Sequence, residues 1–174
     1  MTFTCLLHNQ CACSKQTTID RARTNKYVKI VHAFDWSSQS DNTTLIYEEV
    51  MSVIDEIGDK FPSLKFRHIR LGGKDGSIYC DICRQIRSAD IGIFDVSTQN
   101  LNVILELGLA IGAGIYIFIL RSRHSRRRQR SLSDLNGILE YRFSRKSGRL
   151  KFEANFKQSL KNKLLYAAKR RLKK

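Results

Sequence analysis

The chain has 174 residues, which is the size of one domain and enough to bury a proper core. Its 42% hydrophobic content, with nine Phe, excludes an intrinsically disordered chain. Residues 1–120 carry 12 Lys and Arg against 13 Asp and Glu, whereas residues 121–174 carry 19 against 3. The net charge of +15 therefore comes from the last third of the chain. Either this region, Arg121–Lys174, is a solvated basic face or it contacts a polyanion.

Five cysteines, an odd number, argue against a disulfide framework. The first apolar run is too short for a signal peptide, so we expect a cytoplasmic protein. Residues 1–26 are polar and aperiodic, which predicts a flexible lead-in to one domain over residues 27–174.

A zinc site is suggested by residue type alone near the N-terminus, at Cys5, His8, Cys11 and Cys13. Cys11-x-Cys13 is a poor chelating spacing, and the Cys80-x-x-Cys83 pair falls in a predicted helix. Ordinary reduced thiols, and no metal, are therefore the expectation.

The first regular elements are a strand and an amphipathic helix. Residues 27–34 are rich in β-branched and aromatic residues and predict a strand, which opens into the polar loop of residues 35–38. Asp41, Asn42 or Thr43 can cap the next helix, and Gly58 ends it. The apolar positions of this helix predict one buried face, made of Ile46, Val50, Val53, Ile54 and Ile57.

A glycine-rich loop follows the second predicted strand, residues 64–69. Gly72, Gly73 and Gly76 would let backbone N–H groups approach a ligand, although the spacing matches neither a Walker loop nor the dinucleotide GxGxxG motif. A plain turn is the alternative. Ser77 then caps a helix that runs to about Ser88, with a buried stripe at Ile78, Ile82 and Ile86.

The centre of the chain is a βαβ unit between residues 90 and 121. A short strand, Ile91–Phe94, ends on Asp95, and a polar turn leads to the apolar helix Asn102–Ala113. A second apolar strand, Ile115–Leu120, ends at Arg121. Glu106 is the one charge inside this unit, in a helix that is apolar on nearly every face.

A membrane span is the rival interpretation of Leu101–Leu120, which carries one charge and precedes an arginine-rich stretch. Glu106 at mid-span would cost about 2.5–3.5 kcal/mol. Gly112 and Gly114 also divide the run into a helix-length and a strand-length piece. We therefore expect no membrane span.

The last third predicts a short helix near residues 133–136, an edge strand over Leu139–Phe143, and an amphipathic helix over Lys151–Arg171. The inward positions expected on that final helix are Phe152, Phe156, Leu160, Leu164 and Tyr166. Strands and helices thus alternate, which predicts an α/β fold with a five-stranded parallel sheet, flavodoxin-like order 2-1-3-4-5, and helices on both faces.

Ligands of such sheets bind at the carboxyl ends of the strands, where the order reverses between strands 1 and 3. The loops after strands 1, 2 and 3 meet there, and Glu106 lies just over one turn into the helix that leaves this crevice. Its carboxylate is expected to face a ligand, or else to pair with an arginine such as Arg84 or Arg87 or with a capped helix end. The expected ligand-binding residues are Asp35, Trp36, Ser37, Gly73, Gly76, Asp95, Ser97, Asn100 and Asn102.

A single carboxylate beside a sugar suits cleavage of an N-glycosidic bond, because it can stabilise or attack an oxocarbenium ion or hold the ribose hydroxyls. Asp35 and Asp95 could hold hydroxyls or position water. Asn100 and Asn102 could bind amides, hydroxyls or phosphate.

Residues 88–121 resemble the core signature of the superfamily of TIR-like and nucleoside 2-deoxyribosyltransferase-like proteins, with its D-x-S-x-x-N-x-N-V-x-x-E-L-G-x-A pattern. The resemblance implies a flavodoxin-like fold and makes Glu106 the catalytic carboxylate. Asp95, Asn100 and Asn102 match positions that line the ribose or phosphate site. The first loop lacks the Gly-rich opening of the deoxyribosyltransferases, which favours the TIR-like branch.

The resemblance implies an N-glycosidase that cleaves NAD or a related nucleotide, with NAD as substrate and no cofactor. It also implies self-association or an activating partner, and a role in bacterial antiviral defence. The alternatives are a non-catalytic nucleotide sensor, a nucleoside 2-deoxyribosyltransferase or nucleotide N-hydrolase, and a nucleic-acid-associated module that uses residues 121–174.

Overall fold

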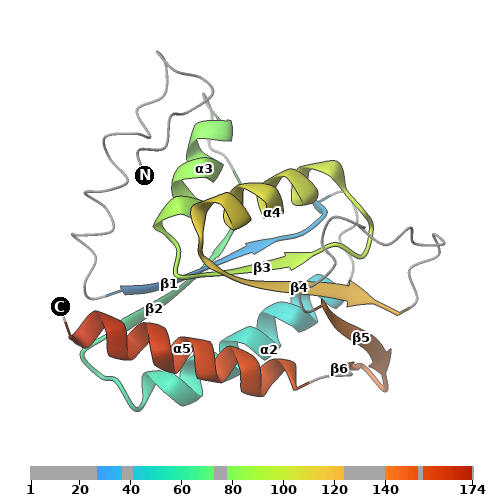
Figure 1. Cartoon of the computed structure of the whole chain (residues 1–174). Coiled ribbons are helices and arrows are strands. Elements are labelled where there is room, and N and C mark those ends of the chain that lie inside the picture. Colours follow the sequence, from blue (N-terminus) through green and yellow to red (C-terminus); the bar gives the residue numbers. More distant parts are fainter. Residues whose placement is uncertain (1–26, 37–40, 73–77, 124–139, 153–154, 174) are drawn as a thin grey trace.

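The computed structural model describes residues 27–36, 41–72, 78–123, 140–152 and 155–173, and these form an α/β fold around a mostly parallel sheet (Figure 1). The strands are β1 (Tyr27–Ala33), β2 (Lys65–Arg70), β3 (Ile91–Asp95), β4 (Tyr116–Ser122), β5 (Glu140–Lys146) and β6 (Arg149–Phe152). The helices are α2 (Asp41–Gly58), α3 (Ile78–Ser88), α4 (Leu101–Ala113) and α5 (Phe156–Leu172).

The strand order is β2-β1-β3-β4-β5-β6. The first five strands pair in parallel, as when Ile30 of β1 faces both His68 of β2 and Ile91 of β3. Their order is the flavodoxin-like one, with its switch point between β1 and β3. This part of the prediction is confirmed, including the βαβ unit formed by β3, α4 and β4.

The prediction of five strands is wrong, because a sixth strand forms a hairpin with β5. β6 pairs antiparallel with β5, from Lys146 opposite Arg149 to Phe143 opposite Phe152. Ser147 and Gly148 both have positive φ values, 50° and 76°, as a two-residue hairpin turn of the I′ type requires. The final helix accordingly begins at Phe156 rather than at Lys151.

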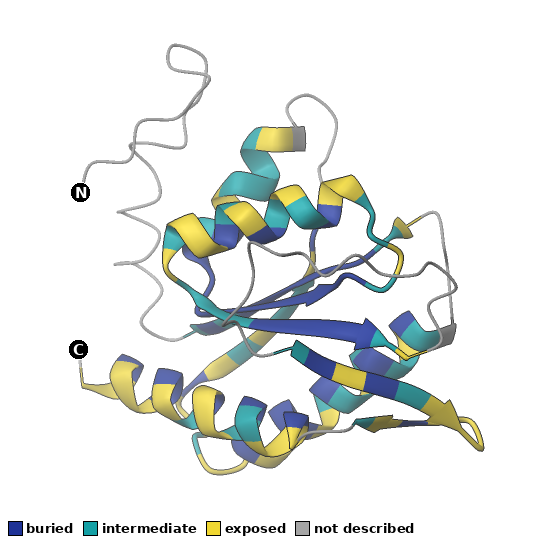
Figure 2. Ribbon diagram, turned by 45° about the vertical axis from the view of Figure 1, so that its right-hand side comes forward, coloured by how far each residue is buried: buried dark blue, intermediate teal, exposed yellow. Residues whose placement is uncertain are grey.

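Two helices cover each face of the sheet: α3 and α4 lie on one face, and α2 and α5 lie side by side on the other (Figure 1). The expected apolar face of α2 is entirely buried, and Phe156, Leu160 and Leu164 of α5 join the same core. Phe152 of β6 stacks on Phe156 of α5, with ring centroids 4.5 Å apart. Figure 2 shows the buried strands between helices whose outer faces are exposed.

Several expectations lie outside the described residues. These are the flexible lead-in with Cys5, His8, Cys11 and Cys13, the loop residues Ser37, Gly73 and Gly76, and the short helix near residues 133–136. Cys80 and Cys83 lie in α3, as expected. Within the described ranges, no helix is both long and apolar enough to cross a membrane. The stretch Leu101–Leu120 is divided between α4 and β4.

Candidate functional site

The turn after β3 is built around Asp95, the last residue of that strand. The Asp95 carboxylate accepts hydrogen bonds from the backbone N–H of Ser97, at 3.0 Å, and from its hydroxyl. The Ser97 hydroxyl oxygen in turn accepts from the N–H of Ser122, at 2.7 Å, which ties the turn to the end of β4. Asp95 and Ser97 thus fix the carboxyl edge of the sheet, and this gives both predicted ligand-binding residues a structural role.

Trp36 bridges the loops after β1 and β2. Its indole N–H donates to the carbonyl of Leu71 at 3.1 Å, and its ring packs on Phe34 with centroids 4.5 Å apart. The side chain is nevertheless 54% exposed. A half-exposed aromatic ring at the switch point is a surface on which a planar base can stack, so Trp36 remains a sound candidate for ligand contact.

Asp35 and Asp95 are close enough to influence each other across the β1–β3 switch point. Burial raises the pKa of Asp95 above its usual value, the hydrogen bonds from Ser97 oppose this, and the negative charge of Asp35 adds to the rise. Two carboxylates whose charges repel each other favour a ligand that brings hydroxyl donors or positive charge. The structure therefore brings Asp35, Trp36, Asp95 and Ser97 together at one edge.

The two asparagines at the start of α4 have different positions. Asn100 is the N-cap, and its side-chain oxygen accepts from the N–H of Asn102 at 2.9 Å. The side chain of Asn102 is exposed. Asn102 and Glu106 are four residues apart and therefore share one side of α4, so Asn102 lies between the carboxyl edge and the candidate carboxylate.

Glu106 is half-buried in the second turn of α4, and burial raises the pKa of its carboxyl group from 4.5 to about 7. The expected alternative was an ion pair with Arg84 or Arg87. Arg84 instead pairs with Asp81 at 2.6 Å, and within the described ranges no hydrogen bond or ion pair reaches Glu106. A partly desolvated carboxylate with no partner among the described residues is costly, and such groups gather at functional sites.

The environment of α4 is asymmetric, although its sequence is apolar on nearly every face. Only Val103, Leu107 and Ala110 are fully buried, whereas the opposite side exposes Leu101, Leu105 and Ile111. Among the described residues, α4 packs mainly on the sheet and beside α3, so these apolar side chains stay exposed. The hydrophobicity of the sequence alone gives no sign of this asymmetry.

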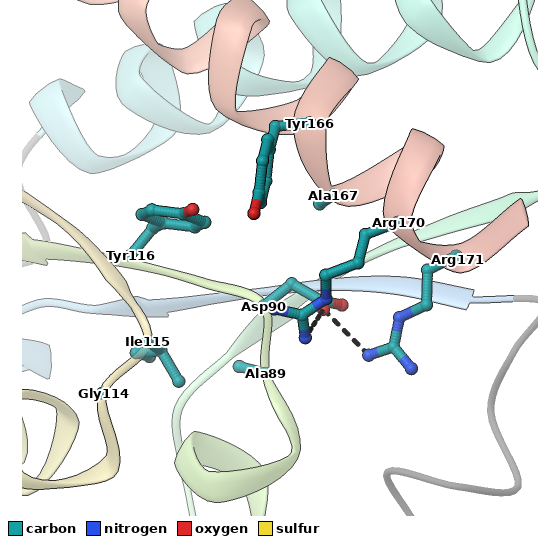
Figure 3. A pocket seen from close by; sticks show the side chains of 9 residues that line it. All are labelled: Ala89, Asp90, Gly114, Ile115, Tyr116, Tyr166, Ala167, Arg170 and Arg171. Carbon is teal, nitrogen blue, oxygen red and sulfur yellow. Dashed lines mark hydrogen bonds and ion pairs between the residues drawn. The ribbon is translucent and has the colours of Figure 1, made fainter. Parts of the chain in front are cut away.

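Sequence reasoning also missed two further features. His32 of β1 and His68 of β2 are stacked, with ring centroids 5.4 Å apart, and no ring nitrogen of either has a hydrogen-bond partner in the described structure. A hollow lies at the opposite, amino edge of the sheet, between β4 and α5 (Figure 3). In the described ranges no cluster of three or more His, Cys, Asp or Glu side chains could hold a metal ion.

Comparisons with known proteins do not place the chain in a family. No protein-family model matches it, and no curated protein matches it either. Among solved structures, a mutant flavo di-iron protein from Thermotoga maritima superimposes with a TM-score of 0.44 at 11% sequence identity. The match covers 91% of this chain but only 41% of that protein. A likeness this weak carries no argument, so the doubly wound class of this fold rests on its own sheet order.

Proposed function

We propose that the protein is a TIR-like N-glycosidase that cleaves NAD or a related nucleotide at the bond between ribose and base. Glu106 is the catalytic carboxylate, and the surrounding groups are those at the carboxyl edge, Asp35, Trp36, Asp95 and Asn102. As in the family that residues 88–121 resemble, a role in antiviral defence is part of the proposal, and NAD is a substrate rather than a cofactor.

The observation that carries the proposal is the state of Glu106. Its carboxylate is half-buried, its pKa is raised to about 7, and no described residue pairs with it. A structural carboxylate in an apolar helix is normally paired, because burial of a lone charge costs several kcal/mol. A carboxylate that faces a positively charged transition state gains its partner only during the reaction.

The chemistry needs little beyond this group. As the glycosidic C–N bond breaks, its electron pair moves to the nicotinamide nitrogen, which leaves as a neutral base, and the ribose becomes an oxocarbenium ion. Ionised Glu106 stabilises this cation, and water then adds to the anomeric carbon and loses a proton. Asp35 and Asp95 would hold hydroxyls or orient that water, while Trp36 would stack on a base.

The decisive experiment measures nicotinamide released from NAD by concentrated protein. Glu106→Gln keeps the size of the side chain but removes its charge, so we expect turnover to fall by at least about a hundredfold. Glu48→Gln, an exposed glutamate on α2, is the matched control and should retain full activity. Equal turnover by wild type and Glu106→Gln would exclude the proposed mechanism.

The same assay separates the alternative functions. Ligand-dependent thermal stabilisation without release of a base, at any protein concentration, would identify a nucleotide sensor. Transfer of deoxyribose to a second base, in assays with paired nucleosides, would identify a deoxyribosyltransferase. Release of a base from other nucleotides, but not from NAD, would keep the role of Glu106 and change the substrate.

Self-association is also part of the proposal. Leu101 is 81% exposed and Leu105 is 52% exposed on the outer side of α4, and Ile111, 42% exposed, lies farther along the same helix. Because α4 also carries Glu106, contact between two copies through this helix would act on the candidate catalytic residue directly.

Contact with a polyanion through residues 121–174 has weaker support. Arg121 is buried and pairs with Glu140 at 3.0 Å, and Arg171 is buried against Asp90. Lys157 and Lys161 pair with Glu49 and Glu56 of α2. These four cations belong to the fold, so a polyanion would have to use other basic residues, such as those of the exposed β5–β6 hairpin.

A further inference from the structure

A hollow of about 210 Å³ opens at the amino edge of the sheet, beside Gly114 at the C-terminal end of α4, whereas Glu106 lies in the second turn of that helix. Its walls come from three places: the residues just before β3, the α4–β4 turn, and the last turns of α5 (Figure 3). The volume is below the range of roughly 300–1,000 Å³ that is usual for drug-sized ligands. The space therefore suits a small molecule.

Asp90 forms the floor of this hollow and already has its own partners. Its side chain is 4% exposed, and it accepts hydrogen bonds from the backbone N–H of Lys29, at 3.0 Å, and from the Arg171 guanidinium, at 2.8 Å. These contacts neutralise and solvate the carboxylate. Asp90 and Arg171 together are a structural ion pair that joins α5 to the start of β3.

Arg170 is a second cation beside Asp90, and the hydrogen-bonded pair of Asp90 and Arg171 is complete without it. Its guanidinium approaches Asp90 only to 4.0 Å, beyond hydrogen-bond length, and its side chain is 55% exposed. In Figure 3 its guanidinium lies against Asp90, with a dashed line for their ion pair. A guanidinium has five N–H donors in a planar fork, which matches two oxygens of a phosphate or carboxylate group.

Two tyrosines form the opposite wall. The rings of Tyr116 and Tyr166 meet edge to face, with centroids 5.7 Å apart, and their hydroxyls share a hydrogen bond. Of their two O–H protons, one is used in this bond and the other is left for a ligand. Lys163 lies over the Tyr116 ring, 4.3 Å from its centroid. With Asp90 neutralised by Arg171, Arg170 adds a positive charge to the lining, and Lys163 adds another beside Tyr116. They outweigh the partial negative charge of about half a unit at the end of α5.

We propose that this hollow binds the phosphate group of a small phosphate ester, with Arg170 as the cation and the remaining O–H of the Tyr116–Tyr166 pair as a further donor. A phosphate offers several strong acceptor oxygens to donors that converge from two elements, and charge-assisted hydrogen bonds of this kind are the strong ones. The site lies at the edge of the sheet opposite the proposed catalytic residues, so it is independent of the proposed function.

The test is isothermal titration calorimetry on the full chain at constant ionic strength, with inorganic phosphate, ribose 5-phosphate and ribose as separate probes. We expect the two phosphates to bind and ribose not to bind. Tighter binding of ribose 5-phosphate would identify an ester as the ligand, and equal binding would identify free phosphate. Glu106→Gln should bind both phosphates as wild type does, which distinguishes this hollow from the proposed catalytic site.

Arg170→Ala should weaken phosphate binding by roughly tenfold or more, while the adjacent, exposed Lys169→Ala should change it less than about twofold. Both variants lose one positive charge from the last turn of α5, but only residue 170 lines the hollow. Tyr166→Phe, which removes one hydroxyl, should also weaken binding. No phosphate binding by wild type, or equal losses in Arg170→Ala and Lys169→Ala, would overturn the proposal.

Discussion

Glu106 should reduce the stability of the folded chain above neutral pH. Its pKa is raised from 4.5 to about 7, so the folded state holds this proton over a range in which the unfolded chain has lost it. The favourable contribution is present below about pH 4.5 and is lost as the pH rises through about 7. Because the side chain is only half-buried, solvent screening reduces the effect to about 1–2 kcal/mol.

We therefore expect Glu106→Gln to be more stable than wild type at pH 8, by about 1–2 kcal/mol, and equally stable at pH 4. Denaturant titrations at both pH values measure the difference. Glu48→Gln should show no such pH-dependent gain. An equal or lower free energy of unfolding for Glu106→Gln at pH 8 would mean that the carboxylate has a partner in the folded protein.

His32 and His68 act in the opposite direction, which is why the comparison must be between variants. Burial lowers the pKa of His32 to about 3 and that of His68 to about 4, and the nearby Arg70 adds to both shifts. Unfolding lets both imidazoles bind protons below about pH 6.5, so their contribution to stability falls with falling pH. Wild type and Glu106→Gln share both histidines, so their difference isolates Glu106.

Gly92 lies in a buried central strand and Gly108 lies on the exposed surface of a helix, so a side chain at these two positions has different consequences. A Cβ at Gly92 of β3 would lie 2.5 Å from the Phe94 ring and 3.1 Å from Ile115, whereas a Cβ at Gly108 of α4 meets nothing within 4 Å. The Phe94 ring is fully buried, so it has little room to move.

Gly92→Ala should therefore destabilise the protein by about 1–3 kcal/mol through overpacking. Gly108→Ala should stabilise it by about 0.5–1 kcal/mol, because alanine is the better helix former. Thermal unfolding of the two variants beside wild type tests both signs. If both substitutions destabilised the protein, Gly108 would be in contact with something beyond the described residues.

The strength of local signals explains how much of the fold could be predicted. The periodicities of α2, α3 and the βαβ unit are long and regular, so their positions were predicted to within a few residues. The hairpin was missed because β6 is only four residues long and runs into a helical pattern of apolar residues. The Ser147–Gly148 pair between two alternating segments was the available signal.

For the candidate site, the sequence predicts which strand ends come together, but it does not predict the contacts between their loops. Sheet order alone brings Asp35 and Asp95 together, and a capping residue is expected where Asn100 lies. The hydrogen bonds that Asp95 shares with Ser97, and the contact of Trp36 with Leu71, depend on how separate loops meet. The hollow at the amino edge is lined by residues as far apart in the chain as 89 and 171, and no local sequence pattern indicates that they lie near each other.

At the scale of the whole molecule, part of the positive charge of the C-terminal region helps to position α5 against α2. The last helix is basic, and α2, beside which it packs, supplies Glu49 and Glu56 as partners for two of its lysines. Each of these pairs is weak on its own because solvent screens it, but together they favour one placement of α5 on the sheet. The apolar contacts of Phe156, Leu160 and Leu164 provide most of the stabilisation.

The exposed apolar surface of α4, formed by Leu101, Leu105 and Ile111, leads to the last prediction. If copies of the chain associate through it, Leu105→Ser should shift sedimentation profiles toward the monomer, and specific activity should no longer rise with protein concentration. Leu172→Ser is the matched control, since Leu105 and Leu172 are each 52% exposed but lie on different helices. Association that survives Leu105→Ser, or that is lost equally in both variants, would contradict an interface on α4. An interface there would place a second copy beside the helix that carries Glu106, and this would explain why so apolar a helix leaves one side uncovered in a single chain.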